Sequence, residues 1–153
     1  MTTPNNPASP LLTDTDWQRL SNDTQEYVAA SFELMTKAHG YLRDGDLRQA
    51  SEKGWGSAAQ ILKAVAENWK DAGVTHGRHQ DLRALVHGLA SLNNESDLDT
   101  GFYAAQDLHE NFYENDAPEY IVTLNLRRTE QFCGVMLPWL RRPRPPQGFR
   151  QGR

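Results

Sequence analysis

Apolar side chains recur every three or four residues through most of this chain, and this spacing restricts the fold more than any other feature. Only a helix of about 3.6 residues per turn brings positions with such spacing to one side. The pattern extends over about residues 14–140, and no segment shows the alternate-residue pattern of a half-buried strand. The sequence therefore predicts an all-α fold.

Five blocks carry this pattern, and the residues between them mark where the chain turns. Gly40 is expected to end the first helix, and the turn Asp44-Gly45-Asp46 that follows reverses the chain. Pro138 is expected to kink or fray the last turn of the fifth helix. Short connections favour antiparallel neighbours, so we predict an up-and-down bundle of about five helices. The expected helices cover about residues 14–39, 46–71, 80–92, 98–114 and 117–140.

Composition changes at both ends of the chain. Residues 1–13 hold three prolines among small polar residues, so we expect a flexible lead-in. Residues 141–153 hold five arginines and no acidic residue, so we expect a disordered basic tail rich in Pro and Arg. A chain of 153 residues suits one hydrophobic core, which we place in residues 14–140.

The charge balance and the cysteine content exclude several classes of protein. Without the tail, 11 Lys and Arg face 20 Asp and Glu, a net charge of −9, which is poorly suited to wide, non-specific binding of nucleic acid. The single cysteine, Cys133, excludes an internal disulfide and a multi-thiolate zinc site, and it suits a reducing compartment. No apolar run approaches the length of a membrane span. We expect a soluble, cytoplasmic protein with no membrane partner.

The second predicted helix carries a line of small residues between two charges. Gly56 and Ala59 lie close to one line on the helix, with Glu52 one turn before them and Lys63 one turn after them. This arrangement is typical of a shallow ligand cleft, and equally of a tight helix crossing with charges at its rim. Small residues serve packing more often than binding, so the crossing is the favoured interpretation.

The fourth predicted helix places polar residues on and beside its apolar face. His109 falls in the apolar row, and Tyr113 follows it one turn later on the same face, with Asn111 and Glu114 nearby. A buried imidazole beside a phenol can act as an acid, a base or a donor to phosphate near neutral pH. The alternative is a structural His109, hydrogen-bonded to a carbonyl or an acid.

Arg128 interrupts an apolar row on the last predicted helix. An inward-facing arginine needs a partner, because an unpaired buried charge costs several kcal/mol, and Glu52, Glu114 or Tyr113 can supply it. A salt bridge alone would also account for Arg128. The row consists of Ile121, Leu124, Arg128, Phe132, Val135 and Trp139. The sequence predicts a polar pocket among the first, second, fourth and fifth helices, lined by Glu52, Lys63, His109, Tyr113 and Arg128.

Metal, phosphate-loop and hydrolase motifs are absent from the sequence. His76 and His79 lie in the loop before the third predicted helix, but two histidines without a third ligand indicate a solvated turn rather than a metal site. The sequence has no Gly-rich phosphate loop, no His-Glu-x-x-His motif and no nucleophile elbow. We therefore expect no cofactor and no bound metal.

Three segments resemble HEPN-like helical domains, and within them the archaeal PaREP-type family. The resemblance covers about residues 25–140. The segments are GDLRQASEKGWGSAA at 45–59, THGRHQDL at 75–82 and LHENFYE at 108–114.

The resemblance implies a homodimer and a role with RNA or nucleotides. Many HEPN proteins are metal-independent ribonucleases or nucleotide-binding partners of small nucleotidyltransferases. The ribonuclease members carry an Arg followed, after four to six residues, by a His. Here Arg83 and His87 have only three residues between them, and Arg78 directly precedes His79. Arg83 and His87 form either a displaced ribonuclease pair or part of an exposed helix face.

Three functions follow from the sequence. The leading hypothesis is a non-catalytic module that binds a nucleotide, an RNA end or a protein partner. The second is a metal-independent ribonuclease of the toxin type, with His109, Arg83 and His87 as catalytic residues. The third is a helical interaction scaffold with no ligand. For the first hypothesis, the ligand-binding residues are Glu52, Lys63, Asn111, Tyr113, Glu114 and Arg128.

Overall fold

The computed structural model describes residues 6–93 and 96–152, and these residues form an all-helical bundle without a strand. Within the described ranges, none of the helices combines the length and the apolar character needed to cross a bilayer. The α-helices are α1 (Asp14–Arg19), α2 (Asn22–Arg43), α3 (Leu47–Asn68), α4 (His79–Asn93), α5 (Ser96–Glu114) and α6 (Glu119–Met136), with short 3₁₀ helices η1 (Lys70–Ala72) and η2 (Leu137–Arg141).

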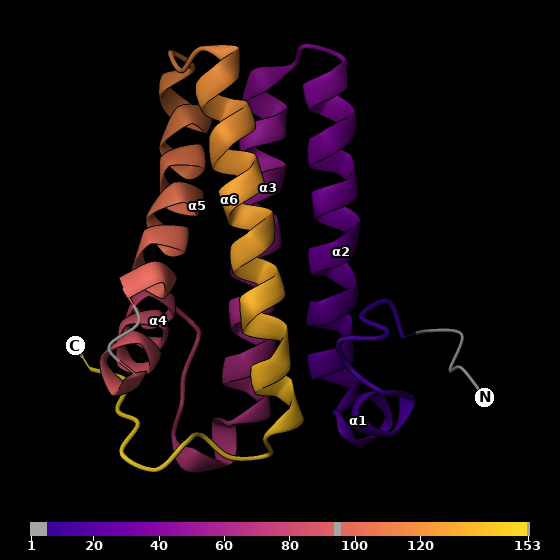
Figure 1. Cartoon of the computed structure of the whole chain (residues 1–153), viewed down its shortest axis with the longest axis vertical. Helices are drawn as coiled ribbons and strands as arrows, with labels where there is room; N and C mark the ends of the chain where they lie inside the picture. The colour runs from indigo at the N-terminus through magenta and orange to yellow at the C-terminus, as the bar shows by residue number, and fades with distance from the viewer. Residues whose placement is uncertain (1–5, 94–95, 153) are drawn as a thin grey trace.

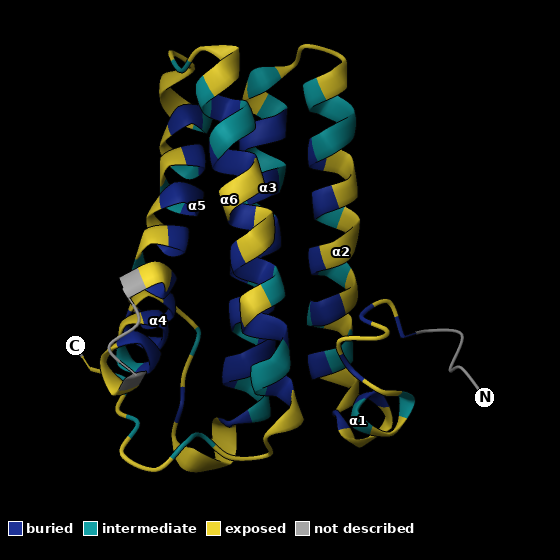
Figure 2. Ribbon diagram, in the orientation of Figure 1, coloured by how far each residue is buried: buried dark blue, intermediate teal, exposed yellow. Residues whose placement is uncertain are grey.

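The four long helices α2, α3, α5 and α6 run side by side, with α1 at the foot of α2 and α4 beneath α5 (Figure 1). Helix α3 lies at the centre, because it packs against α2, α5, α6 and α4. Buried residues lie mainly on the faces that the helices turn toward one another (Figure 2). The predicted bundle is confirmed in its class and in the packing of its long helices.

Helix α3 allows close packing because its first half holds small residues. A Cβ atom at Gly54 would lie only 2.8 Å from Leu108 of α5 and equally close to Leu126 of α6. On the other side of α3, the Ser57 hydroxyl donates to the Ser31 carbonyl of α2 at 2.7 Å, and the Ser31 hydroxyl donates back to the Ser57 carbonyl at 2.8 Å. The small residues are therefore where neighbouring backbones approach most closely.

The first predicted helix is wrong in its continuity and in its end. It divides at Ser21, whose extended backbone and side chain cap α2 by accepting the Thr24 amide at 3.1 Å. Helix α2 then continues through Gly40 to Arg43, since one glycine costs a helix only about 1 kcal/mol. The chain reverses at Gly45, where φ is +80°, a value that glycine adopts without strain.

The last predicted helix is divided by its proline, as expected, but its buried face is wrong. Helix α6 ends at Met136 and the segment around Pro138 forms η2. Arg128 is exposed, because the buried face lies about one residue away from the predicted row, a rotation of about 100°. The buried face consists of Val122, Asn125, Leu126, Thr129, Phe132, Cys133 and Met136.

The described parts of both ends pack against the bundle, which differs from the flexible lead-in and disordered tail expected from the sequence. Leu12 is fully buried, and the Asn6 amide donates to the Leu12 carbonyl at 3.0 Å. At the other end, the Trp69 indole donates to the Arg142 carbonyl at 2.9 Å. Prolines prevent helix formation here but do not prevent side chains from anchoring an extended backbone. Residues 1–5 and 153 lie outside the described residues.

Candidate functional site

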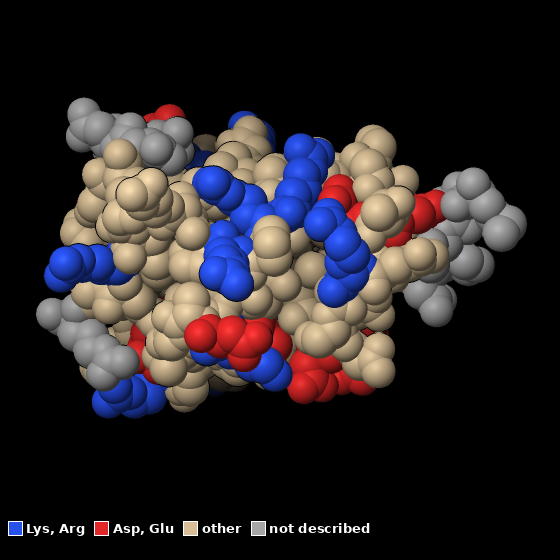
Figure 3. Space-filling model, turned by 90° about the horizontal axis from the view of Figure 1, so that it is seen from below, with Lys and Arg blue, Asp and Glu red and all other residues tan. Residues whose placement is uncertain are grey.

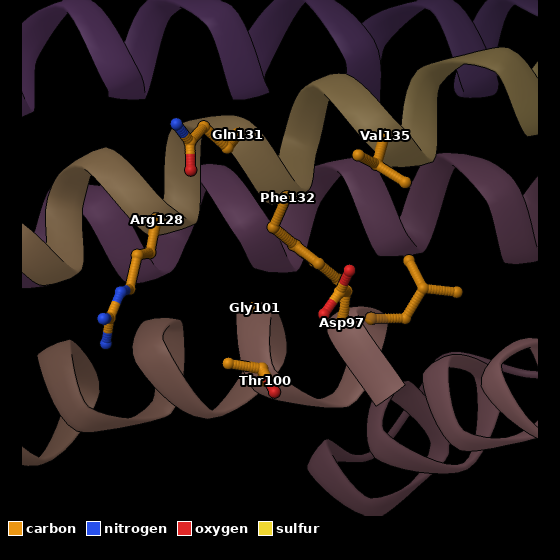
Figure 4. A pocket seen from close by; sticks show the side chains of 8 residues that line it. Asp97, Thr100, Gly101, Arg128, Gln131, Phe132 and Val135 are labelled. Carbon is orange, nitrogen blue, oxygen red and sulfur yellow. The ribbon is translucent and has the colours of Figure 1, made fainter. Parts of the chain in front are cut away.

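The structure does not assemble the polar pocket predicted around His109 and Arg128. The Arg128 side chain lies on the surface of α6 and reaches toward α5 (Figure 4). There it lines a groove of about 590 Å³ together with Asp97 and Val135, and His109 does not line this groove. Tyr113 is 67% exposed. The prediction fails because the assumed face of the last helix is rotated.

The line of small residues on α3 is a helix contact rather than a cleft. A Cβ atom at Gly56 would lie 3.1 Å from a methyl carbon of Leu34, so α2 already fills the space above the glycine. The flanking Glu52 carboxylate lies 3.9 Å from Lys53 on the same helix, and Lys63 is half-buried. Glu52 and Lys63 therefore do not face a shared ligand cavity over this strip.

Asn111 is buried and holds the bundle together. Its side-chain nitrogen donates to the Ser51 hydroxyl of α3 at 2.9 Å. Its side-chain oxygen accepts the backbone amides of Asp116 at 3.1 Å and Ala117 at 2.9 Å. These bonds tie α5 to α3 and fix the turn before α6, so the Asn111 amide has a structural role. Glu114, at the end of α5, is exposed.

His109 belongs to a cluster of stacked rings between α3, α4 and α5. Its ring centroid lies 4.8 Å from that of Trp55, with an interplanar angle of 30°. His79, the first residue of α4, stacks on Trp55 at 5.0 Å and lies 5.9 Å from His109. Tyr113 meets the edge of the His109 ring at 5.4 Å. We name Trp55, His79 and His109 the ring cluster.

The sequence connected neither Trp55 nor His79 to His109. Burial lowers the pKa of His79 below its usual value, and the nearby charges of Arg83 and His109 lower it further. The neutral imidazole is therefore favoured near neutral pH. The loop position of His79 concealed this contact, since the helix begins one residue earlier than the pattern predicted.

A groove beside the ring cluster brings together Arg83 and His87 of α4. These residues line one face, one turn apart, opposite Asp99 and Tyr103 of α5. The groove has a volume of about 430 Å³. The Nδ1 atom of His87 lies 3.6 Å from a carboxylate oxygen of Asp99, which allows an ion pair when His87 is protonated. We call this feature the α4–α5 groove.

The ring cluster and the α4–α5 groove are adjacent parts of one surface. Phe102 lines the groove and also meets the rings of Trp55 and His79 at 6.0 Å. His79 and Arg83 are one turn apart on α4, and the Arg83 charge acts on His79. A ligand in the groove therefore lies beside polarisable rings, a cation and titratable imidazoles. Sequence reasoning missed Asp99 and Tyr103, whose types and spacing give no distinct signal.

Other candidate residues have structural contacts. Among the residues that the structure describes, no three His, Cys, Asp or Glu side chains lie close enough together to hold a metal ion. His76 meets the Glu67 carboxylate at 3.0 Å and the edge of Tyr27 at 5.5 Å. Burial raises the pKa of Cys133 to about 12, so this thiol is a poor nucleophile near neutral pH.

Comparison with known proteins gives one match. A family model described as the archaeal PaREP1/PaREP8 family matches residues 26–133. Neither a curated protein nor a solved structure matches the chain. The matched range includes the ring cluster and the α4 and α5 residues of the groove.

Proposed function

The chain belongs to the archaeal PaREP1/PaREP8 family, and from this membership we propose that it is a helical module that binds a nucleotide or an RNA end in the α4–α5 groove. The HEPN-like resemblance of the sequence supports this proposal, since many HEPN proteins act on RNA or bind nucleotides. The groove itself provides the chemical argument.

The observation that carries the proposal is the joint presence of Arg83, His87 and Tyr103 on the walls of one groove. The volume of about 430 Å³ lies in the usual range for small-molecule sites, about 300–1,000 Å³. The Arg83 guanidinium offers paired donors that suit phosphate oxygens. Tyr103 is 55% exposed, and stacking of a base on such a ring is worth about 1–3 kcal/mol.

Asp99 adds a negative charge to the groove, which the proposal has to account for. A carboxylate in a phosphate site repels the ligand unless a cation compensates it. His87 lies beside Asp99, so a protonated imidazole neutralises the carboxylate and leaves Arg83 as the net charge of the groove.

Calorimetric titration with uridine monophosphate tests the proposal. We expect saturable binding by the parent protein, weakened about tenfold or more in Arg83→Ala, because charge-assisted hydrogen bonds contribute about 1.5–3 kcal/mol. Tyr103→Ala is expected to weaken binding by a similar factor. Arg127→Ala, which removes an exposed arginine of α6, is the matched control. Unchanged binding in both groove variants would contradict the proposal.

A ribonuclease is the second candidate, and the arrangement of Arg83, His87 and Asp99 favours it. His87 can accept the proton of a ribose 2′-hydroxyl as its oxygen attacks the adjacent phosphorus, while Arg83 stabilises the charge that develops on phosphate oxygens. The bond from phosphorus to the 5′-oxygen of the next nucleotide then breaks, that oxygen takes a proton from water, and a 2′,3′-cyclic phosphate remains. End-labelled RNA in EDTA tests this candidate. Cleavage by the parent that is lost in His87→Ala would support an enzyme. If His109→Ala alone abolishes cleavage, the reaction would instead depend on the ring cluster.

Two further properties stay proposals. The resemblance implies that the chain pairs with itself, and light scattering at micromolar concentration tests this directly. A monomer under those conditions would remove the homodimer. The expectation of a cytoplasmic protein can be tested by fractionating cells that produce it.

A further inference from the structure

The C-terminal segment, residues 141–152, crosses the lower end of the molecule and is anchored at its start (Figure 1). The Arg141 guanidinium donates to the Leu11 carbonyl at 3.0 Å. The Trp69 indole and the Asn68 side-chain amide both donate to the Arg142 carbonyl, each at 2.9 Å. These bonds hold the backbone and leave most of the arginine side chains at the surface. We call residues 141–152 the strap.

The far end of the strap is anchored beside α4. The Gln151 side chain accepts the Thr75 amide at 2.9 Å and donates to the carbonyls of Thr75 and Asp81, both at 2.8 Å. Phe149 packs on Trp69 with ring centroids 5.7 Å apart. The strap then reaches the α4–α5 groove, which Gly152 helps to line.

Gly88 of α4 determines how closely the strap approaches. A Cβ atom at this position would lie 2.2 Å from the Arg150 carbonyl oxygen, closer than any side chain tolerates. Because the clash is with backbone, an alanine here would push the strap away. The absence of a side chain at Gly88 therefore allows the strap to pack directly against α4.

The strap concentrates positive charge on an otherwise acidic protein. Arg141, Arg142, Arg144 and Arg150 are all exposed, and the strap contains no acidic residue. Figure 3 shows several Lys and Arg side chains across the middle of this end of the molecule, bordered by Asp and Glu side chains. Arginines on an anchored backbone lose less conformational freedom on binding than those of a free tail.

We propose that the strap binds the phosphates of a single-stranded RNA whose terminal nucleotide occupies the α4–α5 groove. This inference rests on the proposed function and extends it from a nucleotide to a polymer. The strap leads without interruption from its arginines to the groove, so one strand can contact both. A membrane surface fits less well, because the aromatic side chain of the strap, Phe149, packs inward on Trp69 and is not available for insertion.

The proposal predicts how steeply RNA affinity falls as the salt concentration rises. Each phosphate of a single strand that is neutralised by Lys or Arg changes the slope of log K against log salt concentration by about −0.7. The Arg141 guanidinium is bonded to Leu11, so the other three arginines, Arg142, Arg144 and Arg150, correspond to a slope of about −2. Affinity is expected to rise with oligomer length until the strap is covered. The affinity for a mononucleotide is expected to depend only weakly on salt concentration.

The test is fluorescence anisotropy with labelled oligouridylates of increasing length, and competition by uridine monophosphate. In Arg142→Gln/Arg144→Gln/Arg150→Gln, we expect the gain in affinity with length to disappear and the slope to fall by about 2 in magnitude. Binding of uridine monophosphate is expected to stay unchanged. The charge-matched control is Arg43→Gln/Arg127→Gln/Arg128→Gln, which changes exposed arginines of α2 and α6.

A second variant tests the position of the strap without changing its charge. Gly88→Ala is expected to reduce the gain with length, since it displaces the strap while favouring the helix itself. If oligomers bind the triple strap variant or Gly88→Ala as tightly as the parent, the strap proposal is overturned.

The outcomes separate the two proposals. Binding of uridine monophosphate with no gain for longer oligomers would overturn the strap alone. Strap-dependent binding of oligomers without any binding of uridine monophosphate would support the strap as a phosphate site and overturn the groove as the site of the terminal nucleotide. No binding of either probe would overturn both.

Discussion

The seam between α2 and α3 and the groove between α4 and α5 both contain polar residues, but they use them differently. In the seam, Ser31 and Ser57 are buried and exchange hydrogen bonds with each other's carbonyls. In the groove, Arg83 and Tyr103 are exposed on the walls of an open space. The first pair stabilises the fold, whereas the second is available to a ligand.

This contrast explains which predicted residues keep a functional interpretation. Asn111 has a promising residue type and lies in the last turn of α5, yet it is buried, and its amide is engaged by Ser51 and by the turn after α5. Arg83 and His87 had a weaker signal in sequence, yet they share a groove. Completed hydrogen bonds therefore separate structural from functional residues better than residue type does.

The largest expected effect is at the centre of the bundle. Gly54→Leu should lower the free energy of unfolding by about 3 kcal/mol, because its side chain would displace Leu108 and Leu126. Gly134→Ala on α6 is the control, since a Cβ atom there meets nothing within 4 Å. Urea denaturation measures both. A tolerated leucine would show that α3 does not need a small residue there.

Asn111→Ala is expected to have the next largest effect. Removing the amide leaves two backbone amides without their acceptor and takes one of two partners from the Ser51 hydroxyl, which still donates to the Leu47 carbonyl. The loss should cost about 2 kcal/mol of unfolding free energy. Binding of uridine monophosphate at temperatures where the variant is folded should stay unchanged. A loss of nucleotide affinity without a loss of stability would instead place Asn111 in the ligand site.

Tyr103→Ala tests whether a groove residue contributes to nucleotide binding without contributing to stability. The ring is 55% exposed, so its removal should change unfolding free energy by no more than about 0.5 kcal/mol. Nucleotide affinity should nevertheless fall in the same variant, as proposed above. Thermal denaturation measures the stability of the variant, and calorimetric titration measures its affinity for the nucleotide. A large destabilisation would mean that Tyr103 belongs to the packing of α5.

The smallest expected effect is a dependence of stability on pH through His79. Its pKa is lowered in the folded protein from the usual 6.5, so the unfolded chain binds more protons as the pH falls through that value. Stability should therefore decrease with falling pH in this window, and less so in His79→Gln. Denaturation at several pH values measures the slope. Equal slopes in both proteins would contradict a neutral His79 in the ring cluster.

The sequence was sufficient for the class of fold but not for the faces of its helices. The clear row of α3, including Leu62 and Val65, predicted a buried helix correctly because every step agreed with one face. In the last helix, Leu124 and Val135 suggested the wrong face. Val135 is in fact 52% exposed in the structure. Apolar residues occur on both sides of α6, so periodicity alone did not fix its rotation.

The candidate site depended on contacts between distant segments, which spacing along the chain does not reveal. His79 and His109 are thirty residues apart and meet through Trp55. Gln151 anchors the strap through bonds to Thr75, a contact that no local pattern indicates. Arg83 and His87 could be placed together from sequence only because they lie on the same helix.

Amide chemical shifts during titration with uridine monophosphate test the central claim most directly. The account expects the shifts to concentrate on residues around Arg83, His87 and Tyr103, with little change around Ser31 and Ser57 in the α2–α3 seam. Shifts gathered instead around Arg128, or no shifts at saturating nucleotide, would contradict the assignment of the α4–α5 groove as the functional site.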